Sequence, residues 1–523
     1  MPRNLAPFMT PESRRRWRSD IPWWSAVGRV LLIPLLLLSA GVLAACGGSG
    51  DDDSPAPAAT SSRPRPAAGP AATITGPIAG GKGTPILAAV AGMADLKPKK
   101  YVESEYFATG TAQSYTAPDA APADGRVKAT PGATADYRTR IIVRRPGDPT
   151  AFNGTLIIEW LNVTGGQDAD PDWAYLAPEI MRSGYAWVGV TTQKVGIDGV
   201  ENGGILPDNG FKLSGLREAD PERYGSLRHP GDAYSYDIFT QVGQALRNPA
   251  SDGEKPLGTL VPKQFIAVGE SQSAATLSTY IDTVQPLTHQ FDGFLVHSRG
   301  AGLAPLNDSV KAGDINSAKP VPLRSDTDVP ILVFETETDL IQLGYAKVTQ
   351  PDSALIRVWE VAGTSHADTT IIGNYAEFLG CDPNINDGPQ LYVIRAALAT
   401  LSTWVHTGKA PPSAPRLQVS SNQADLARDE HGIALGGIRT PVVDVPVSTL
   451  SGVPGKKGGL QCAALGSTTA LDPATVRSLY LDRNAYLAAF AASTDSAIKE
   501  GYLLPADRKD MIARAETYQF PPA

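Results

Sequence analysis

Short runs rich in Val, Ile and Leu recur through the middle of the chain, and amphipathic stretches separate them. Runs of this length and composition predict strands that are buried on both faces of a sheet. We expect strands over residues 138–144, 155–160, 185–191, 265–268, 293–297, 331–336 and 355–361. We expect helices between them over residues 173–183, 235–247 and 274–284. Because parallel strands need such crossovers, the pattern predicts an α/β fold with a mostly parallel central sheet and helices on both faces.

The fourth predicted strand runs into the sequence Gly269-Glu270-Ser271-Gln272-Ser273, and an Ala-rich helix begins directly after it. A strand, a tight Gly-x-Ser turn and a helix are the context in which α/β enzymes hold a nucleophilic serine. Gly269 supplies the small residue that the turn needs, whereas Ser273 stands where a second glycine is usual. The motif predicts Ser271 as a nucleophile, with the backbone N–H of Gln272 and the start of the helix stabilising an oxyanion.

A serine nucleophile needs a base and an acid that orients the base, and in this fold class they follow the serine in the order acid, then histidine. His366, one of only six histidines, lies in the turn after the last predicted strand. Asp339 lies just beyond the strand at 331–336, and Glu337 lies two residues before it. We predict His366 as the base and favour Asp339 over Glu337 as the acid.

Two further regions are candidates for contact with a substrate. The strand at 155–160 is followed by a loop with two adjacent glycines, which predicts that the backbone N–H of Val163 is a second oxyanion donor; a plain glycine turn is the alternative. His297 and Arg299 end another strand at the same edge of the sheet. For these two side chains, a place in the substrate pocket and a structural hydrogen-bonding role both stay open.

The N-terminal segment predicts export. Arginines cluster at positions 14–18, an apolar run covers residues 30–38, and Leu-Ala-Ala-Cys ends at Cys46. This order is typical of a secretory signal peptide over residues 1–45, and its ending resembles a bacterial lipobox in which Cys46 is lipidated. Simple secretion and a transmembrane anchor are the alternatives, but the apolar run is short for crossing a bilayer. Gly47 favours an outer membrane over an inner one in a bacterium that has both.

The remaining chain divides into a tether and one large domain. Residues 46–73 are rich in Gly, Ser, Asp, Pro and Ala, which predicts a flexible tether. We expect the catalytic domain over residues 74–523, with Gly- and Pro-rich insertions at about 195–230 and 301–328. These insertions form either a lid and pocket rim or surface decoration. Helices are predicted from 391 to 407, around 472–493 and over 505–517.

Composition narrows the partners. A net charge of −8 at pH 7 argues against nucleic acid, which calls for a basic surface. No Cys/His cluster has the spacing of a metal site, and no dinucleotide-binding fingerprint stands out, so we expect neither a metal nor a cofactor. Cys381 and Cys462 remain as one candidate disulfide if Cys46 carries lipid; two unpaired buried thiols are the alternative.

Several stretches of the sequence resemble a bacterial family known as α/β-hydrolase domain-containing proteins. They lie at residues 159–163, 269–273, 291–300, 337–339, 363–366, 436–441 and 501–507. The resemblance covers nearly everything from residue 74 onward. It implies an α/β-hydrolase fold and a triad of Ser271, an acid and His366, and it implies little about the substrate.

Together these features predict a serine hydrolase of the bacterial cell envelope that cleaves a small-molecule ester through an acyl-enzyme. Amide hydrolysis and acyl transfer use the same residues and stay open. A surface lipoprotein that binds a ligand on an inactive scaffold is the alternative from another class. That alternative predicts a damaged triad, whereas all three residue types are present in order.

Overall fold

The computed structural model describes most of the chain beyond its N-terminal segment: residues 69–83, 86, 95–118, 122–200, 214–307, 319–373, 375–456, 459 and 462–522. The predicted signal peptide and Cys46 lie outside the described residues, as does the tether up to residue 68. Parts of both predicted insertions, 201–213 and 308–318, also lie outside them. Among the described residues, no helix has the length and apolar character needed to cross a membrane.

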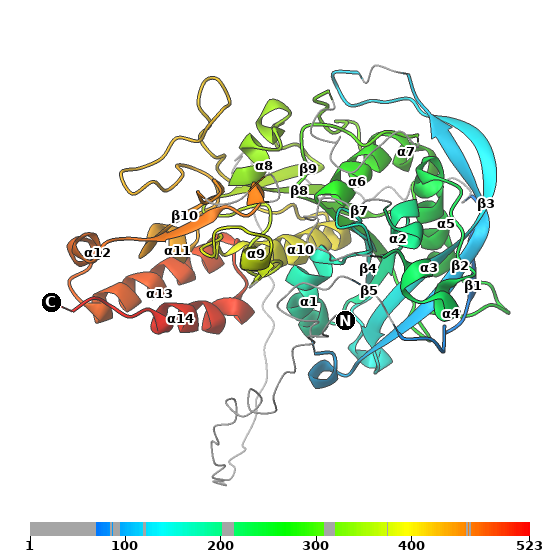
Figure 1. Ribbon diagram of the computed structural model, residues 1–523, viewed down its shortest axis with the longest axis horizontal. Coiled ribbons are helices and arrows are strands. Elements are labelled where there is room, and N and C mark those ends of the chain that lie inside the picture. Colours follow the sequence, from blue (N-terminus) through cyan, green and yellow to red (C-terminus); the bar gives the residue numbers. More distant parts are fainter. Residues whose placement is uncertain are drawn as a thin grey trace, which may run out of the picture. The chain divides into compact units, whose positions relative to one another are not determined.

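A nine-stranded sheet forms the centre of the fold (Figure 1), in the order β1-β2-β3-β5-β4-β6-β7-β8-β9. The strands are β1 Thr73–Thr75, β2 Tyr101–Thr116, β3 Thr130–Pro146, β4 Thr155–Trp160, β5 Ala186–Val190, β6 Gln264–Glu270, β7 Gly293–His297, β8 Ile331–Thr336 and β9 Ile356–Val361. Neighbours from β5 through β9 in this order are parallel, whereas β1, β2 and β3 pair antiparallel at one edge. All seven predicted strands are therefore present in a mostly parallel sheet.

The antiparallel edge was not expected. The prediction of a short strand at 138–144 covers only part of the 17-residue β3, and β1 and β2 were missed. β2 carries buried and exposed positions in an irregular order, including the buried Glu105, so its apolar periodicity is weak. β3 continues past the core because it pairs with β2 over most of its length. The apolar pattern of one strand does not reveal such pairing.

Helices cover both faces of the sheet because successive side chains of each parallel strand point to opposite sides. Phe265 and Ala267 of β6 join the core under α5 (Ser235–Arg247) and α6 (Gln272–Thr283). Ile266 and Val268 join the core under α1 (Pro171–Ser183) and α10 (Gln390–Thr407). This arrangement is the expected sandwich of helix, sheet and helix, and it leaves the carboxyl ends of the strands at one edge.

The C-terminal helices belong to the second of these cores. Figure 1 draws these helices in orange and red. The predicted helix at 472–493 is two helices, since Asp482 caps a new one by accepting a hydrogen bond from the N–H of Ala485. Phe490 and Met511 are buried in the same core as α10. The elements here are α11 Pro441–Asp444, β10 Ser448–Ser451, β11 Ser467–Ala470, α12 Pro473–Leu479, α13 Arg483–Glu500 and α14 Arg508–Thr517.

The described part of the first predicted insertion contains short helices. They are α2 Lys194–Asp198, α3 Leu216–Ala219 and α4 Pro221–Tyr224. Leu216 and Tyr224 pack in a small apolar cluster of their own. Tyr224 also donates a hydrogen bond to Glu105 of β2, and Glu105 pairs with the buried Arg140 of β3 at 3.0 Å. The described part of the insertion is therefore attached to the antiparallel edge by a hydrogen bond to a buried ion pair.

Three other short α-helices connect the main elements. They are α7 Gln285–Thr288, α8 Glu337–Ile341 and α9 Tyr375–Phe378.

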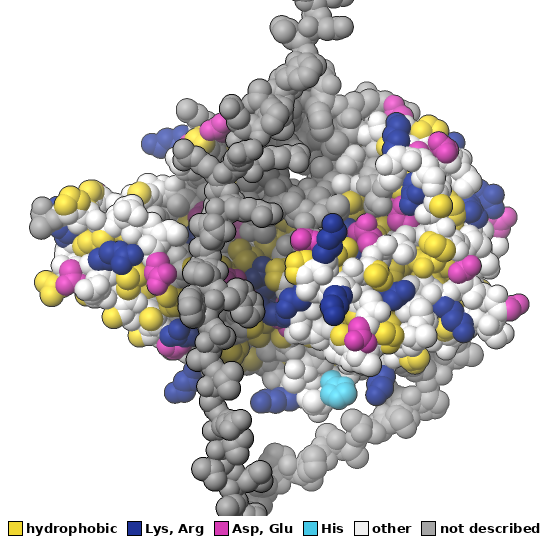
Figure 2. Space-filling view, turned by 90° about the horizontal axis from the view of Figure 1, so that it is seen from below, with side chains coloured by type: hydrophobic (Ala, Val, Ile, Leu, Met, Phe, Trp, Pro, Cys, Tyr) yellow, Lys and Arg dark blue, Asp and Glu magenta, His cyan; other side chains and the backbone are white. Residues whose placement is uncertain are grey.

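On the face drawn in Figure 2, Lys and Arg side chains are interspersed with Asp, Glu and hydrophobic ones over the described part of the surface.

Candidate active site

Ser271 lies in the tight turn between β6 and α6 with a positive φ of 60° and a ψ of −116°. An L-residue rarely adopts this backbone conformation, and such strain clusters at functional positions. A Cβ atom on Gly269 would lie 3.0 Å from the carbonyl oxygen of Ser273, which explains why this position is glycine. The N–H of Ser271 donates to the carbonyl oxygen of His297 on β7, 2.9 Å away, and this bond holds the turn against the sheet.

His366 reaches Ser271 from the turn after β9. Its Nε2 atom lies 2.7 Å from Ser271 Oγ, and its Nδ1 atom lies 2.6 Å from Asp339 Oδ1. These are hydrogen-bond distances, and the Asp339 contact sets which ring nitrogen carries the proton in the neutral imidazole. The structure thus brings Ser271, His366 and Asp339 into one continuous line of contacts.

Asp339 owes its position to the start of α8. Its Oδ2 atom accepts hydrogen bonds from the N–H and the Oγ1 of Thr336, each at 2.7 Å, so that Oδ1 faces His366. Burial alone would raise the pKa of Asp339, but the nearby His366 ring and these hydrogen bonds outweigh it and lower the pKa. Burial opposes a charged His366 as well, yet Asp339 and Glu270 raise the pKa of His366 to about 9.

Glu337, the alternative acid, has other partners. Its carboxylate accepts hydrogen bonds from the N–H groups of Gly363 at 2.7 Å and Gly452 at 3.0 Å. It also pairs with Arg428 at 3.0 Å. Glu337 therefore fastens the turn that carries His366, and the geometry favours Asp339 as the partner of the ring.

The two predicted oxyanion donors lie on either side of the turn. Gln272 is the first residue of α6, so its N–H has no acceptor in an earlier helical turn. On the other side, Asn162 donates from Nδ2 to the carbonyl oxygen of Glu270 at 3.0 Å, which brings the loop of Val163 beside the turn. The N–H groups of Leu161, Asn162 and Thr164 each donate a hydrogen bond to another group of the protein. Among these four residues, the N–H of Val163 remains the candidate donor.

The other two predicted pocket residues are buried and hydrogen-bonded within the protein. His297 is fully buried, with Nδ1 2.8 Å from Asp172 Oδ1 and Nε2 3.0 Å from Gln390 Nε2. Arg299 is 1% exposed and donates to the carbonyl oxygens of Gly300 and Val321. Both arrangements are those of structural residues that join separate elements.

A small hollow next to Gln272 was not anticipated from the sequence. Gln193, which follows β5, accepts hydrogen bonds from Gln272 Nε2 at 2.8 Å and Trp160 Nε1 at 3.2 Å. With Asp232 and Ser235 these side chains line a cavity of about 20 Å³, enough for one water-sized group. A lone glutamine after a strand carries no sequence signal, since only the fold brings it beside the turn.

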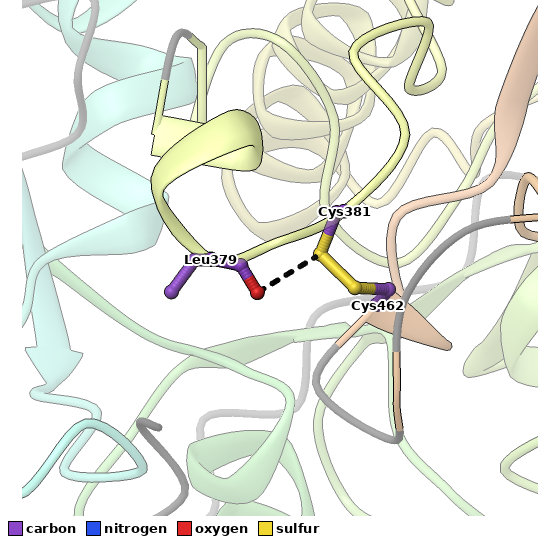
Figure 3. Close-up of a disulfide and its surroundings, with 3 residues drawn as sticks. All are labelled: Leu379, Cys381 and Cys462. Atoms are coloured by element: carbon purple, nitrogen blue, oxygen red, sulfur yellow. Dashed lines mark hydrogen bonds between the residues drawn. A yellow bond between two sulfur atoms is a disulfide. The ribbon is translucent and has the colours of Figure 1, made fainter. Parts of the chain in front are cut away.

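A disulfide-bonded segment contacts the turn of His366, and Figure 3 shows the disulfide. Cys381 and Cys462 form a disulfide with Cα atoms 5.6 Å apart, and Cys381 Sγ lies 4.0 Å from the carbonyl oxygen of Leu379. The N–H of Ala367 donates to the carbonyl oxygen of Ala464, two residues after Cys462. The disulfide therefore anchors the segment that bonds to the turn of the base. Within the described ranges, no three His, Cys, Asp or Glu side chains gather as metal ligands would.

A family model described as an alpha/beta hydrolase domain matches residues 74–513, which is most of the chain. A search of curated proteins found no match. Among solved structures, a glucuronoyl esterase from Solibacter usitatus is 11% identical, with 60% of this chain and 86% of that chain covered and a TM-score of 0.27. A fungal esterase from Rhizomucor miehei is 14% identical, with 57% and 82% covered and a TM-score of 0.27. A serine hydrolase without a lid from Xanthomonas campestris is 12% identical, with 48% and 83% covered and a TM-score of 0.25. On the strength of the family model, this chain belongs to the alpha/beta hydrolase domain family.

Proposed function

We propose that the protein is an exported serine hydrolase that cleaves carboxylic esters through an acyl-enzyme at Ser271. One observation carries the proposal: Ser271 Oγ lies 2.7 Å from His366 Nε2, and His366 Nδ1 lies 2.6 Å from Asp339 Oδ1. A serine hydroxyl is a weak nucleophile unless a base removes its proton, and this line of contacts supplies the base and the group that orients it.

In the first half-reaction, Ser271 Oγ attacks the ester carbonyl while its proton moves to His366 Nε2. The carbonyl oxygen becomes an oxyanion, which the N–H groups of Gln272 and Val163 stabilise. The tetrahedral intermediate collapses, the carbon–oxygen bond to the alcohol breaks, and His366 gives its proton to the departing oxygen. A water molecule then attacks the acyl-enzyme with His366 again as base, which releases the acid and restores Ser271.

Asp339 acts through the ring of His366. Because its carboxylate accepts a hydrogen bond from the N–H at Nδ1, Nε2 is left free to receive a proton from Ser271. The positive ring that forms is also stabilised by the buried negative charge beside it. Amide hydrolysis and acyl transfer run on the same groups, so a substrate panel rather than the geometry separates them from ester hydrolysis.

Export and lipidation form a second part of the proposal, supported by the basic and apolar N-terminal stretches and the Leu-Ala-Ala-Cys ending at Cys46. The disulfide between Cys381 and Cys462 fits an oxidising compartment outside the cytosol. We expect radiolabelled palmitate to be incorporated into this protein when cells express the wild-type chain. We expect no incorporation into the protein when they express the Cys46→Ser variant. Equal incorporation by both would contradict a lipid anchor at this residue.

The test of the catalytic proposal is the turnover of short-chain p-nitrophenyl esters and matched anilides by the purified protein. We expect ester turnover, and a fall of about 10³-fold or more in the Ser271→Ala variant, since the nucleophile is lost. Ser278→Ala is the matched control, because this serine lies on the same helix and bonds within it to the carbonyl of Ala274. A folded wild-type protein that is inert toward esters, anilides and acyl acceptors would favour the non-catalytic binding protein.

A further inference from the structure

Glu270 is the residue before the nucleophile, and its carboxylate faces the ring of His366. Glu270 Oε1 lies 3.6 Å from His366 Nε2, the same nitrogen that Ser271 Oγ approaches at 2.7 Å. Asp339 occupies the other edge of the ring, at Nδ1. The imidazole therefore lies between two carboxylates, one at each nitrogen.

The position of the Glu270 carboxylate is fixed by the loop of the predicted oxyanion donor. Asn162 Nδ2 donates to Glu270 Oε2 at 3.3 Å and to the backbone carbonyl oxygen of the same residue at 3.0 Å. Glu270 is 7% exposed and ends β6, so its backbone belongs to the sheet. A carboxylate held this way has little freedom to turn away from His366.

The site around Glu270 is rich in groups that titrate. Burial raises the pKa of Glu270 to about 7, against the opposing influence of two nearby histidines. The groups that act on it come from α1, β7, α8 and the turn after β9, and they are Asp172, Tyr175, His297, Asp339 and His366. The charge of Glu270 in turn contributes to the raised pKa of His366. The protonation of each group therefore influences the pKa of the other.

We propose that Glu270 is a positioning residue for the reaction proposed above: its carboxylate holds the Nε2 edge of His366 and stabilises the imidazolium that forms when Ser271 attacks. As Ser271 Oγ bonds to the ester carbon, its proton passes to Nε2 and later to the leaving alcohol oxygen. Glu270 exchanges no proton in this sequence. It contributes a second negative charge beside the ring at the moment when the ring becomes positive.

This arrangement has a cost at rest. An ionised Glu270 also favours the protonated ring in the free enzyme, and a protonated His366 cannot accept a proton from Ser271. Since the pKa of His366 is raised to about 9, the reactive neutral ring appears only as the pH rises toward that value. The charge of Glu270 thus lowers the rate near neutral pH, where His366 is mostly protonated. The same charge raises the maximal rate, which is reached at alkaline pH.

The test is the pH profile of kcat/KM for the Glu270→Gln variant of the full chain. Glutamine has the shape of glutamate, and its carbonyl oxygen still accepts a hydrogen bond from Asn162. An opposite charge at this distance shifts a pKa by roughly 1 unit or more, so we expect the acid limb to move down by about 1 unit. The fraction of the maximal rate reached at pH 7 should rise about tenfold, while the maximal rate falls several-fold.

The Glu270→Asp variant is the matched control. It keeps the charge and shortens the side chain, so its acid limb should stay near that of the wild type. If Glu270 had a structural role alone, Glu270→Gln would lower the rate by the same factor at every pH, with no shift of the limb. Superimposable normalised profiles for wild type and Glu270→Gln would overturn the inference.

The inference rests on the proposed function, but it has a readout that needs no turnover. The pKa of His366 can be followed by NMR of the imidazole ring in the full chain, assigned by comparison with His366→Ala. We expect Glu270→Gln to lower this pKa by about 1 unit. An unchanged His366 titration would contradict the role of Glu270 even in an active enzyme. A shifted titration in a protein without esterase activity would support the contact and reject only the proposed reaction.

Discussion

Two of the histidine–aspartate pairs among the described residues lie in the interior, and only one of those two meets a nucleophile. His366 and Asp339 approach to 2.6 Å, and His297 and Asp172 approach to 2.8 Å. In both pairs burial opposes a charged ring, the aspartate outweighs it, and the pKa of the histidine is raised. The pairs differ at the other ring nitrogen. His366 faces Ser271 there and its side chain is 11% exposed, whereas His297 faces Gln390 and is fully buried.

The difference shows that a histidine–aspartate pair alone does not mark an active site. The ring of His297 packs against Tyr175 and Phe334, with centroids 5.5 and 5.2 Å away, and is enclosed by the protein. The side-chain contacts of His297 join α1, β7 and α10. Its backbone carbonyl oxygen accepts a hydrogen bond from the N–H of Ser271. The second pair thus supports the nucleophile through the backbone, while the first reaches it through a side chain.

The largest expected effect is on the first pair. Asp339→Asn should lower kcat for ester hydrolysis by about 10⁴-fold, because the amide no longer holds the ring in the tautomer that accepts the Ser271 proton. Ester turnover and the thermal unfolding midpoint should be measured together. The matched change at the second pair, Asp172→Asn, should lower turnover per folded molecule by less than about tenfold. A similar loss of turnover in both variants would erase the functional distinction between the pairs.

The second pair should instead show its effect in stability. Asp172→Asn leaves a buried His297 without its anionic partner, which we expect to lower the free energy of unfolding by about 3–5 kcal/mol. Because the raised pKa of His297 reflects stabilisation of its protonated form, that contribution is present at acidic pH and is lost as the pH rises through the folded-state pKa. Urea unfolding of wild type and variant at pH 5 and pH 9 measures both effects. Unfolding curves that coincide would contradict a structural role for the pair.

A smaller effect is expected from the disulfide that supports only the first pair. Replacing both Cys381 and Cys462 by serine should lower the free energy of unfolding by about 2–4 kcal/mol, because the unfolded chain regains the freedom of an open loop. Turnover should fall several-fold, since the segment of Ala464 that bonds to the His366 turn is less firmly held. The double variant and the reduced wild type should behave alike. Unchanged kcat in both would show that the turn is positioned without the disulfide.

The sequence predicted the parallel strands and the nucleophile turn because each carries a local signal. An apolar run predicts a buried strand, and Gly269 with Ser271 between a strand and a helix predicts the turn. The order of acid and histidine predicted which residues the fold brings together, and the structure places Asp339 rather than Glu337 at the ring. The predicted signal peptide and lipidated Cys46 lie outside the described residues and stay predictions.

Other features depend on contacts between distant segments and left no local signal. The buried Glu105 weakens the apolar pattern of β2, so the antiparallel edge was missed. The contact between Glu270 and His366 joins residues 96 positions apart in the sequence (366 − 270) and becomes visible only when the strands are aligned. The roles of His297 and Arg299 could not be separated from the sequence, because burial decides between a pocket residue and a structural one.

Labelling with a fluorophosphonate, followed by intact mass and peptide mapping, tests whether Ser271 is the nucleophile. We expect one phosphonyl group per chain, on the peptide that contains Ser271. The label should be absent from the Ser271→Ala variant and retained in a folded His297→Gln variant. The rate of labelling should be strongly reduced in the His366→Ala variant. A label on another residue, or undiminished labelling of Ser271→Ala, would contradict the assignment of Ser271 as the nucleophile.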